Sequence, residues 1–277
     1  MATATTEVPN ETAAKTLVHY EVQSGVALFT LDDPPANTYT HEMMVQLDAA
    51  ILRARFDPTV DVIVITGTGE KFFCAGANIN MLQQADPTWK YYFCLHANET
   101  LLKLEHTPKL VIAALNGHTV GGGLEIAMAA DLRIARRGAG KIGLPEVALG
   151  VLPGTGGTQR LTKLVGASKA IELMVQGNNV DFDEAAGMGI VNRVIDAGSK
   201  DEFLASVLEY ARQFTRPNKA TFAVGNIKRS CQSGAELPLE QGLALERELQ
   251  ALLFNSQDAK EGLNAYVQKR TAQFIGK

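Results

Sequence analysis

The chain has 277 residues, of which 46% are hydrophobic and 20% charged, and its formal net charge is −4. This composition is typical of a globular enzyme, and the acidic balance argues against a nucleic-acid binder, whose surface is usually basic. No apolar run approaches the roughly 20 residues of a membrane span, so we expect neither nucleic acid nor a membrane as partner.

The N-terminal half begins with a polar, acidic stretch, residues 1–15, which we expect to be a disordered leader because it lacks the features of a signal peptide. Residues 17–22 and 26–31 are β-like runs separated by Ser-Gly, which predicts a hairpin. Apolar residues at helical spacing predict a helix over residues 43–56. The apolar run 62–65 is typical of a strand that is buried on both faces.

The middle of the chain alternates strands with helices. Residues 110–115 and 132–135 read as strands, and residues 124–130 between them read as a helix. Such alternation indicates an α/β core with crossover connections, which we assign to residues 16–198. Residues 199–277 show only helical patterns, and this C-terminal region either folds over the core or packs against a partner subunit.

Side-chain patterns add three expectations. Phe203, Val207, Leu208 and Ala211 form one apolar helix face, and leucines between residues 239 and 253 form a second. Three arginines, Arg133, Arg136 and Arg137, predict a basic patch, read as a solvated edge or as electrostatic help for a phosphorylated ligand. The three cysteines, Cys74, Cys94 and Cys231, are too widely spaced for a disulfide framework, which favours a reducing, cytoplasmic location.

The most informative stretch is glycine-rich and carries two glutamates. A glycine triplet at residues 121–123 precedes Glu125, and Glu146 follows 21 positions later in a Pro-Glu pair. Glycines allow a backbone amide to approach a ligand closely, and a helix start presents unpaired N–H groups to an anion. The stretch therefore predicts a site that stabilises a developing anion while two carboxyl groups move protons.

Motifs for other chemistries fail. His41-Glu42 opens like a zinc-binding H-E-x-x-H, but Val45 replaces the second histidine. The two Gly-Thr-Gly runs lack the final glycine of the dinucleotide fingerprint, having Phe72 and Gln159 in its place. No Walker A sequence or G-x-S-x-G elbow is present. We therefore expect no metal or redox cofactor.

Four segments carry a resemblance to a known family. Residues 73–79, FCAGANI, resemble the F-x-A-G-A-D-[IL] segment of the enoyl-CoA hydratase (crotonase) family. Residues 116–125 resemble its N-G-x-x-x-G-G-G-x-E block, and residues 145–161 its P-E-x-x-x-G-x-x-P-G-x-G-G-T-Q-R-L block. Residues 261–270 are similar to its E-G-x-x-A-F-x-E-K-R tail. The ordered blocks make the resemblance specific.

This resemblance implies an α/β spiral of ββα units that holds an acyl-CoA thioester and assembles as a homo-trimer or a dimer of trimers. Coenzyme A enters only as part of the substrate. The backbone N–H groups of Ala77 and Gly122 match the family's oxyanion hole, and Glu125 and Glu146 match its acid/base pair. The residues that match its substrate-binding positions are Ala75, Asn78, Ile79, Asn80, Gly154 and Lys269.

The implied activity is the reversible syn addition of water to a 2-enoyl-CoA. Two amide donors would stabilise the enolate, Glu146 would donate a proton to Cα, and Glu125 would act on the water. An alternative on the same scaffold is a double-bond isomerase, which can manage with one carboxylate. An RNA-binding or scaffold protein with a crotonase shell is a third, and it would need a basic stripe.

Simpler structural interpretations compete with several of these assignments. Glu125 alone could be a surface residue that favours a helix dipole, and Pro145-Glu146 an ordinary helix start. His118 is expected to be packed or hydrogen-bonded, and Cys74 to act as a small hydrophobe. The matching flanks favour the functional reading of both glutamates.

The chain also departs from the family pattern. Asn78 replaces the usual acidic residue and Asn80 stands where hydratases often carry lysine, so contacts near the adenosine end are expected to differ. An aromatic cluster falls where the family shapes its acyl pocket. It could favour a short, branched or cyclic acyl group, or it could be core. Its members are Trp89, Tyr91, Tyr92 and Phe93.

Overall fold

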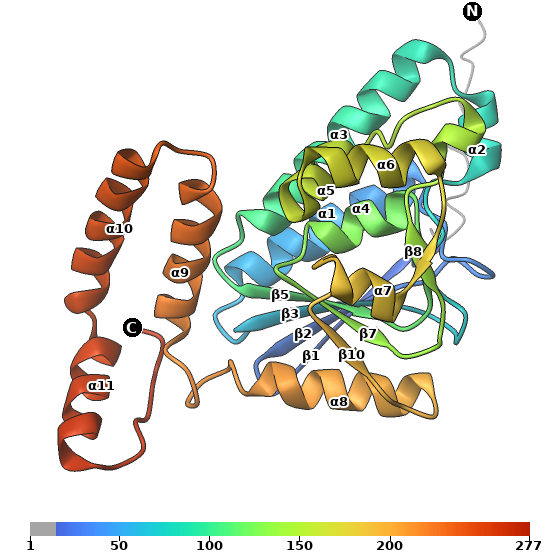
Figure 1. The fold of residues 1–277 in the computed structure, drawn as a ribbon. Helices are drawn as coiled ribbons and strands as arrows, with labels where there is room; N and C mark the ends of the chain where they lie inside the picture. Colours follow the sequence, from blue (N-terminus) through green and yellow to red (C-terminus); the bar gives the residue numbers. More distant parts are fainter. Residues whose placement is uncertain (1–14) are drawn as a thin grey trace, which may run out of the picture.

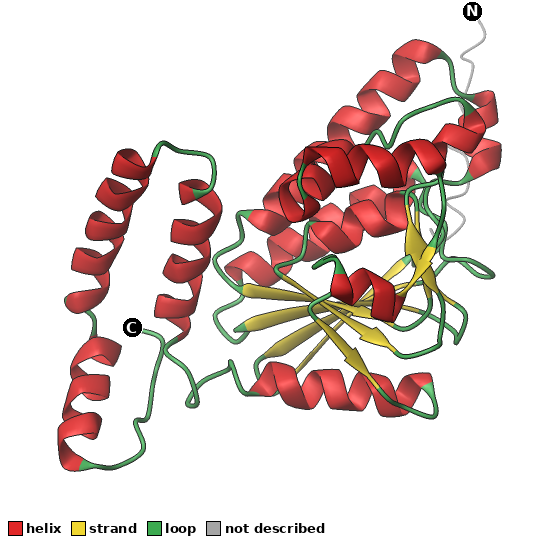
Figure 2. Ribbon diagram, viewed as in Figure 1, coloured by secondary structure: helices red, strands yellow, loops and turns green. Residues whose placement is uncertain are grey.

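The computed structural model describes residues 15–277, so the expected leader lies outside the described residues except for its last position. A six-stranded sheet runs through the body in the order β1-β2-β3-β5-β7-β10, and a four-stranded sheet stands beside it (Figures 1 and 2). The large sheet contains β1 (Val18–Gln23), β2 (Val26–Leu31), β3 (Val62–Gly67), β5 (Leu110–Leu115), β7 (Leu132–Arg136) and β10 (Arg193–Ile195). The small sheet contains β4 (Phe72–Cys74), β6 (His118–Val120), β8 (Lys141–Gly143) and β9 (Val180–Asp181).

The predicted N-terminal elements are confirmed. β1 and β2 pair antiparallel across a turn at Ser24 and Gly25, both of which have positive φ. The first helix, α1 (His41–Phe56), begins after Thr40, whose hydroxyl accepts the Met43 N–H. The strand β3 is buried along its whole length, as an apolar run without alternation predicts.

Successive strand pairs build the spiral. In each of β3–β4, β5–β6 and β7–β8, the first strand joins the large sheet and the second joins the small one. Helices follow these pairs, and all neighbours in the large sheet after β2 run parallel. The intervening helical elements are α2 (Ile79–Gln84), α3 (Pro87–Glu105), α4 (Gly122–Met128), η1 (Glu146–Leu149), α5 (Gly157–Val165), α6 (Ala167–Gln176) and α7 (Phe182–Gly187). The expected spiral of ββα units is therefore confirmed.

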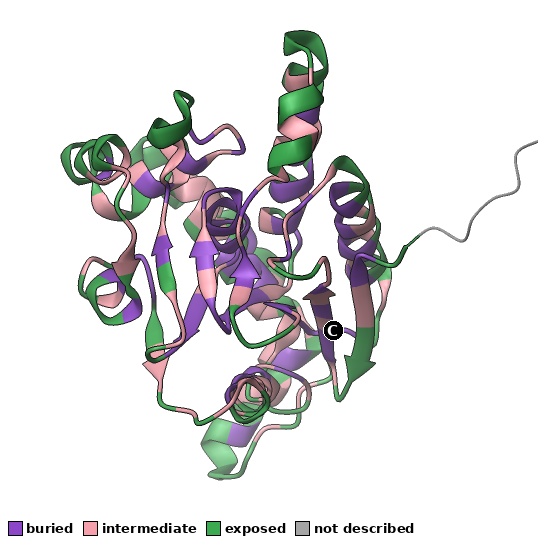
Figure 3. Cartoon of the chain, turned by 90° about the vertical axis from the view of Figure 1, so that its right-hand side faces the viewer, coloured by how far each residue is buried: buried purple, intermediate pink, exposed green. Residues whose placement is uncertain are grey.

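The large sheet separates two cores, because alternate side chains of a strand point to opposite faces. Ile63 and Ile65 of β3 pack with α1, α3 and α4, whereas Val62 and Val64 face α8 (Lys200–Arg212). The central strands are mostly buried (Figure 3). The expected apolar face of α8 is confirmed, since Phe203 and its helical neighbours Val207 and Ala211 are buried there.

The last three helices form an arm that extends from the body (Figure 1). They are α9 (Thr221–Gly234), α10 (Leu239–Phe254) and α11 (Gln257–Gln268). The expected leucine face of α10 stays largely uncovered: Leu249 is buried, but Leu239, Leu243 and Leu252 are exposed. No helix within residues 15–277 is long and apolar enough to cross a membrane.

The basic patch predicted from three arginines does not form. Arg133 is buried and donates to the carbonyl oxygens of Ile190 and Ala130, at 2.6 and 2.7 Å. Arg136 is also buried and pairs with Glu70 at 2.6 Å. The arginines are close in sequence, but successive side chains of β7 point to opposite faces of the sheet. Backbone carbonyl groups also bind the Arg133 side chain inside the body. Only Arg137 remains at the surface.

A buried ion pair attaches α9 to the body. The Lys228 ammonium lies 2.9 Å from the Asp131 carboxylate and donates to the Lys109 carbonyl oxygen at 3.1 Å. The Asp131 carboxylate also accepts the Val111 N–H and the Gln232 side-chain amide. Removing one partner would leave a buried charge with few compensating contacts, which is costly.

We expect Lys228→Ala to lower the free energy of unfolding by about 3–5 kcal/mol, because Asp131 would remain buried without its cation. Lys169→Ala is the matched control, since Lys169 pairs with Glu172 at the surface, and it should change the value by under about 1 kcal/mol. Urea unfolding followed by circular dichroism measures both. Equal small effects would show that the pair does not hold the arm.

Candidate active site

The glycine triplet forms the turn from β6 into α4. Gly121 has φ +57° and ψ −132°, a conformation that only glycine adopts readily, and its N–H donates to the Gly143 carbonyl oxygen at 2.9 Å. The helix begins at Gly122, and all seven of its residues are buried. The turn therefore starts a buried helix directly after β6, an inner strand of the small sheet.

Two glycine backbones meet at this turn. A Cβ on Gly76 would lie 3.1 Å from the Gly122 nitrogen, and Gly76 has φ +89°. A Cβ on Gly122 would lie 2.3 Å from the Tyr39 ring. Among the described residues, neither the Ala77 N–H nor the Gly122 N–H donates a hydrogen bond to the protein. The close approach thus brings two amide donors to one place with their hydrogen atoms available.

Glu125 lies inside the body, and its side chain is held by the loop before α5. It is 2% exposed, and one carboxylate oxygen accepts the N–H groups of Thr155 and Gly157, each at 2.7 Å. Burial raises the pKa of Glu125, while these N–H groups and the Arg160 charge oppose the rise. The reading of Glu125 as a solvated residue that favours the helix dipole is therefore wrong.

Glu146 is the first residue of η1 and lies against the same turn. A Cβ on Gly121 would be 3.0 Å from its Oε1, and its Oε2 is buried without a partner among the described groups. Burial, with a smaller contribution from the negative charge of Glu125, raises the pKa of Glu146 to about 7. The two carboxyl groups thus lie close enough for the charge of one to act on the other, and Glu146 is about half protonated near neutral pH.

The other sequence-predicted residues fall into three groups. Ala75 and Asn78 flank the Ala77 donor, and the Asn78 side chain caps α2 by accepting the Met81 N–H. Ile79 and Asn80 are exposed at the start of α2. A Cβ on Gly154 would lie 3.2 Å from the Cys94 sulfur.

Lys269 is separate from this pocket. It ends α11 with a positive φ of 55°, on the arm that extends from the body, and its side chain is exposed (Figure 1). The α2 segment lies on the opposite side of the body in the same view. Within one chain, the structure therefore does not bring Lys269 to the other predicted substrate-binding residues.

The aromatic cluster divides between core and surface. Phe93 is buried and stacks on Tyr39, and Trp89 stacks on Phe93 with ring centroids 5.2 Å apart. Tyr91 and Tyr92 are mostly exposed. Phe93 therefore belongs to the core, Trp89 stacks on it from a partly exposed position, and the two tyrosines lie at the surface.

Two side chains tested as alternatives have ordinary structural roles. The His118 ring nitrogen accepts the Lys141 N–H at 3.1 Å, so the expected hydrogen-bonded histidine is confirmed. Cys74 is buried, and burial raises the pKa of its thiol to about 12, which keeps it neutral. Neither group is placed to act as a base or nucleophile.

Sequence reasoning missed the residues that hold Glu125. Thr155 and Gly157 lie within a recognised motif, but nothing in its letters showed that their N–H groups bind a carboxylate. Arg160 forms a two-pronged pair with Glu105, both distances being 2.8 Å, and donates to the Thr155 carbonyl oxygen. Tyr39 carried no signal, because a lone tyrosine before a helix is usually a packing residue.

The ββα spiral with its glycine turn and paired carboxyl groups defines a protein of the crotonase fold class. The model of the enoyl-CoA hydratase/isomerase protein family matches residues 21–277 of this chain. The chain belongs to this enoyl-CoA hydratase/isomerase family.

Two relatives and one solved structure show the extent of the similarity. A crotonyl-CoA hydratase of Syntrophomonas wolfei subsp. wolfei is 35% identical over 258 residues, covering 93% of this chain and 97% of the relative. A short-chain-enoyl-CoA hydratase of Clostridium acetobutylicum is 36% identical, covering 90% and 94%. The structure of an enoyl-CoA hydratase from Geobacillus kaustophilus HTA426 superposes with a TM-score of 0.91 at 46% identity, covering 96% and 98%.

The raised pKa of Glu146 predicts how stability depends on pH. A carboxyl whose pKa is higher in the folded state stabilises the fold below its unfolded pKa, near 4.5, and this contribution is lost as pH rises through about 7. Glu146→Gln should therefore unfold at higher denaturant than the parent protein above pH 7, and the difference should shrink toward pH 4.5. Glu209→Gln, at an exposed site on α8, is the matched control. If the difference in stability between Glu146→Gln and the parent protein stayed constant across this pH range, the raised pKa of Glu146 would be contradicted.

Proposed function

We propose that this protein hydrates a 2-enoyl-CoA thioester, reversibly, to a 3-hydroxyacyl-CoA. Its family membership and the hydratases among its relatives support this activity. The single observation that carries the proposal is the pair of carboxyl groups, Glu125 and Glu146, beside two free amide donors. Hydration needs both a base for water and an acid for carbon, whereas an isomerase can move one proton with a single carboxylate.

The amide donors would act on the thioester oxygen. Attack of water at Cβ pushes electron density through Cα onto this oxygen and creates an enolate. Hydrogen bonds from the N–H groups of Ala77 and Gly122 would stabilise that charge, and the loss of one comparable donor costs about 3–4 kcal/mol. Because glycine turns hold both donors before the substrate binds, no reorganisation is required during the reaction.

The two carboxyl groups would divide the proton transfers. Glu125, whose carboxylate accepts two N–H groups, would take a proton from water as the water oxygen bonds to Cβ. Glu146, with a pKa of about 7, would donate its proton to Cα as the enolate collapses to the thioester. In sum, one water is added across the double bond: its hydroxyl bonds to Cβ, its other proton goes to Glu125, and the proton of Glu146 goes to Cα. Proton exchange with solvent then resets the pair, and no metal or redox cofactor is needed.

Substrate binding would use the segment around Ala77 and the arm. We assign Ala75, Asn78, Ile79 and Asn80 to the CoA side of the thioester and Gly154 to the reacting end. Lys269 would bind a CoA phosphate. Since Lys269 lies on the arm, it would reach this site only from a second copy, which supports a homo-oligomer, either a trimer or a dimer of trimers.

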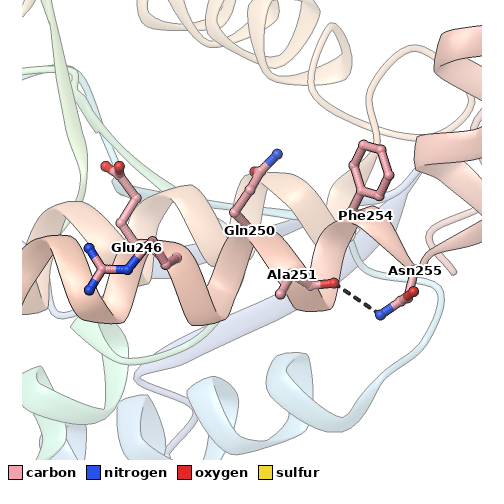
Figure 4. Close-up of a pocket in the computed structure, with 6 residues that line it drawn as sticks. Glu246, Gln250, Ala251, Phe254 and Asn255 are labelled. Carbon is pink, nitrogen blue, oxygen red and sulfur yellow. Dashed lines mark hydrogen bonds between the residues drawn. The ribbon is translucent and has the colours of Figure 1, made fainter.

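The arm has the surface that such an assembly would cover. Glu246, Gln250 and Phe254 project from one side of α10 around a hollow of about 580 Å³, and Asn255 donates to the Ala251 carbonyl oxygen beside it (Figure 4). Phe254 and the nearby Leu252 are exposed in the single chain. Burying them against another copy would stabilise the assembly. A cytoplasmic location stays a prediction, supported by three cysteines that form no disulfide among themselves.

The acid/base pair predicts a large loss of turnover on removal of either carboxyl. With crotonyl-CoA, Glu146→Gln and Glu125→Gln should each lower kcat by about 10²–10⁴-fold, because each removes one placed proton-transfer group. Loss of enoyl-thioester absorbance measures the rate, and calorimetry of CoA-ester binding shows that the site is intact. Turnover that survives Glu125→Gln but moves the double bond would indicate an isomerase.

The divided aromatic cluster predicts which residue limits the acyl group. Trp89→Ala should broaden the preference from short toward longer or bulkier enoyl-CoA substrates, because its ring stacks on the buried Phe93. Tyr91→Ala, at an exposed position of the same helix, should leave the profile unchanged. The ratio of kcat/KM values over a panel of enoyl-CoA esters measures both. Identical profiles for all three proteins would assign Trp89 to packing alone.

A further inference from the structure

Lys90 is a half-buried lysine of α3 whose ammonium pairs with no carboxylate of residues 15–277. The Asp86 carboxylate, at the start of the same helix, instead accepts the N–H groups of Thr88 and Trp89 at 2.8 and 2.9 Å. The ammonium lies over the Phe93 ring, 5.1 Å from its centroid, where the π face attracts a cation. The ring therefore fixes the place of a positive charge that no anion compensates within these residues.

The face of α3 that carries Lys90 borders the reacting end of the site. Residues four apart lie on one face of a helix, so Lys90, Cys94 and Asn98 form a row along α3. A Cβ on Gly154 would lie 3.2 Å from the Cys94 sulfur, and the Asn98 side-chain amide donates to the Gly154 carbonyl oxygen at 3.5 Å. Lys90 therefore begins about 6 Å along the helix from the residue that packs on Gly154.

Aromatic side chains lie between Lys90 and the oxyanion donors. The Phe93 side chain is 2% exposed, and its ring stacks on Tyr39 with ring centroids 5.7 Å apart. The Tyr39 ring lies directly on Gly122, since a Cβ there would be 2.3 Å from it. A path from the Gly122 N–H to the Lys90 ammonium thus follows apolar ring surfaces and ends at a cation.

The charge of Lys90 also acts on the reacting end. Burial is the main cause of the raised pKa of Glu146, and the positive charge of Lys90 opposes that rise. The row on α3 and this charge effect therefore both place Lys90 beside the acyl part of the site.

A cation at the end of an apolar path fits one kind of acyl group. An alkyl chain would remove water from the ammonium without giving it a partner, which costs free energy. A carboxylate at the far end of a short acyl chain would accept a charged hydrogen bond from the ammonium while its CH₂ groups pack on the rings. A CoA phosphate is a weaker match, because the segment assigned to the CoA side precedes α2, whereas Lys90 shares a helix face with the contacts to Gly154.

We infer that the substrate is a 2-enoyl-CoA whose short acyl chain ends in a second carboxylate, and that Lys90 binds this carboxylate. This substrate class rests on the proposed hydratase function of the same site. Lys90 touches the far end of the acyl group, so it determines specificity and takes no part in proton transfer.

Paired substrates of equal length test this role. 4-Carboxybut-2-enoyl-CoA and pent-2-enoyl-CoA differ only in their terminal group, and 5-carboxypent-2-enoyl-CoA and hex-2-enoyl-CoA repeat the comparison with one more carbon. We expect the parent protein to favour the carboxy esters in kcat/KM. Lys90→Met, which keeps the length and removes the charge, should lower kcat/KM for the carboxy esters by about 10- to 100-fold, the size of one charged hydrogen bond. The alkyl esters should react as before or faster.

Three further variants complete the comparison. Lys90→Arg keeps the charge and should retain most of the preference, and Lys90→Gln is a second neutral variant that should lose it. Lys219→Met, at an exposed lysine between α8 and α9, is the matched control and should change neither value. Thermal melting confirms that each variant is folded. An equal loss for carboxy and alkyl esters in Lys90→Met would overturn the inference, because Lys90 would then act on the CoA moiety or on Glu146.

Binding of saturated esters separates this inference from the proposed activity. 4-Carboxybutanoyl-CoA and pentanoyl-CoA cannot be hydrated, so calorimetry with them reports on the acyl subsite alone. The parent protein should bind the carboxy ester about 10- to 100-fold more tightly, and Lys90→Met should bind both equally. This preference without turnover on any enoyl-CoA would support the Lys90 site and reject the hydratase. Turnover of enoyl-CoA esters without any preference in binding would support the hydratase and overturn the Lys90 site.

Discussion

The site depends on one buried carboxyl group, Glu125, whose charged form accepts hydrogen bonds from the fold. Glu125 is a buried residue of α4, so water does not solvate its side chain. Two N–H groups from the loop before α5 donate hydrogen bonds to the carboxylate in place of water. That loop can make these bonds only because α4 and α5 pack together. The packing of consecutive ββα units therefore sets the surroundings of the two carboxyl groups, and different surroundings allow the two groups to have different pKa values.

Glu146, the second carboxyl group, has surroundings opposite to those of Glu125. Its Oε2 has no partner among the described groups, so burial favours the protonated form, whereas the bonds to Glu125 favour the ionised form. Two identical side chains thus obtain different roles from their surroundings. The destabilisation of the Glu146 carboxylate has a cost to the fold, and a strained group of this kind is typical of a functional site.

The arm carries exposed apolar and charged side chains in the single chain. Leu239, Leu243 and Leu252 of α10 are exposed, and Lys269 lies on the arm, away from α2. A buried ion pair between Lys228 and Asp131 nevertheless fixes α9 to the sheet, so the arm is presented in a defined direction. Both features support the proposed homo-oligomer, in which a neighbour would cover the arm and share the CoA site.

The sequence alone predicted most strands of the large sheet, the helices α1, α4, α8 and α10, and the candidate residues, because hydrophobic periodicity and the glycine-glutamate blocks are local signals. It could not determine the surroundings of those residues. The burial of Arg133, the exposure of Leu239 and Leu252, and the burial of Phe93 beside an exposed Tyr91 depend on which surfaces meet. The contact between Tyr39 and Thr155 spans 116 positions and leaves no local pattern. Only the tertiary structure decides such contacts, since solvation and pKa follow from neighbours in space.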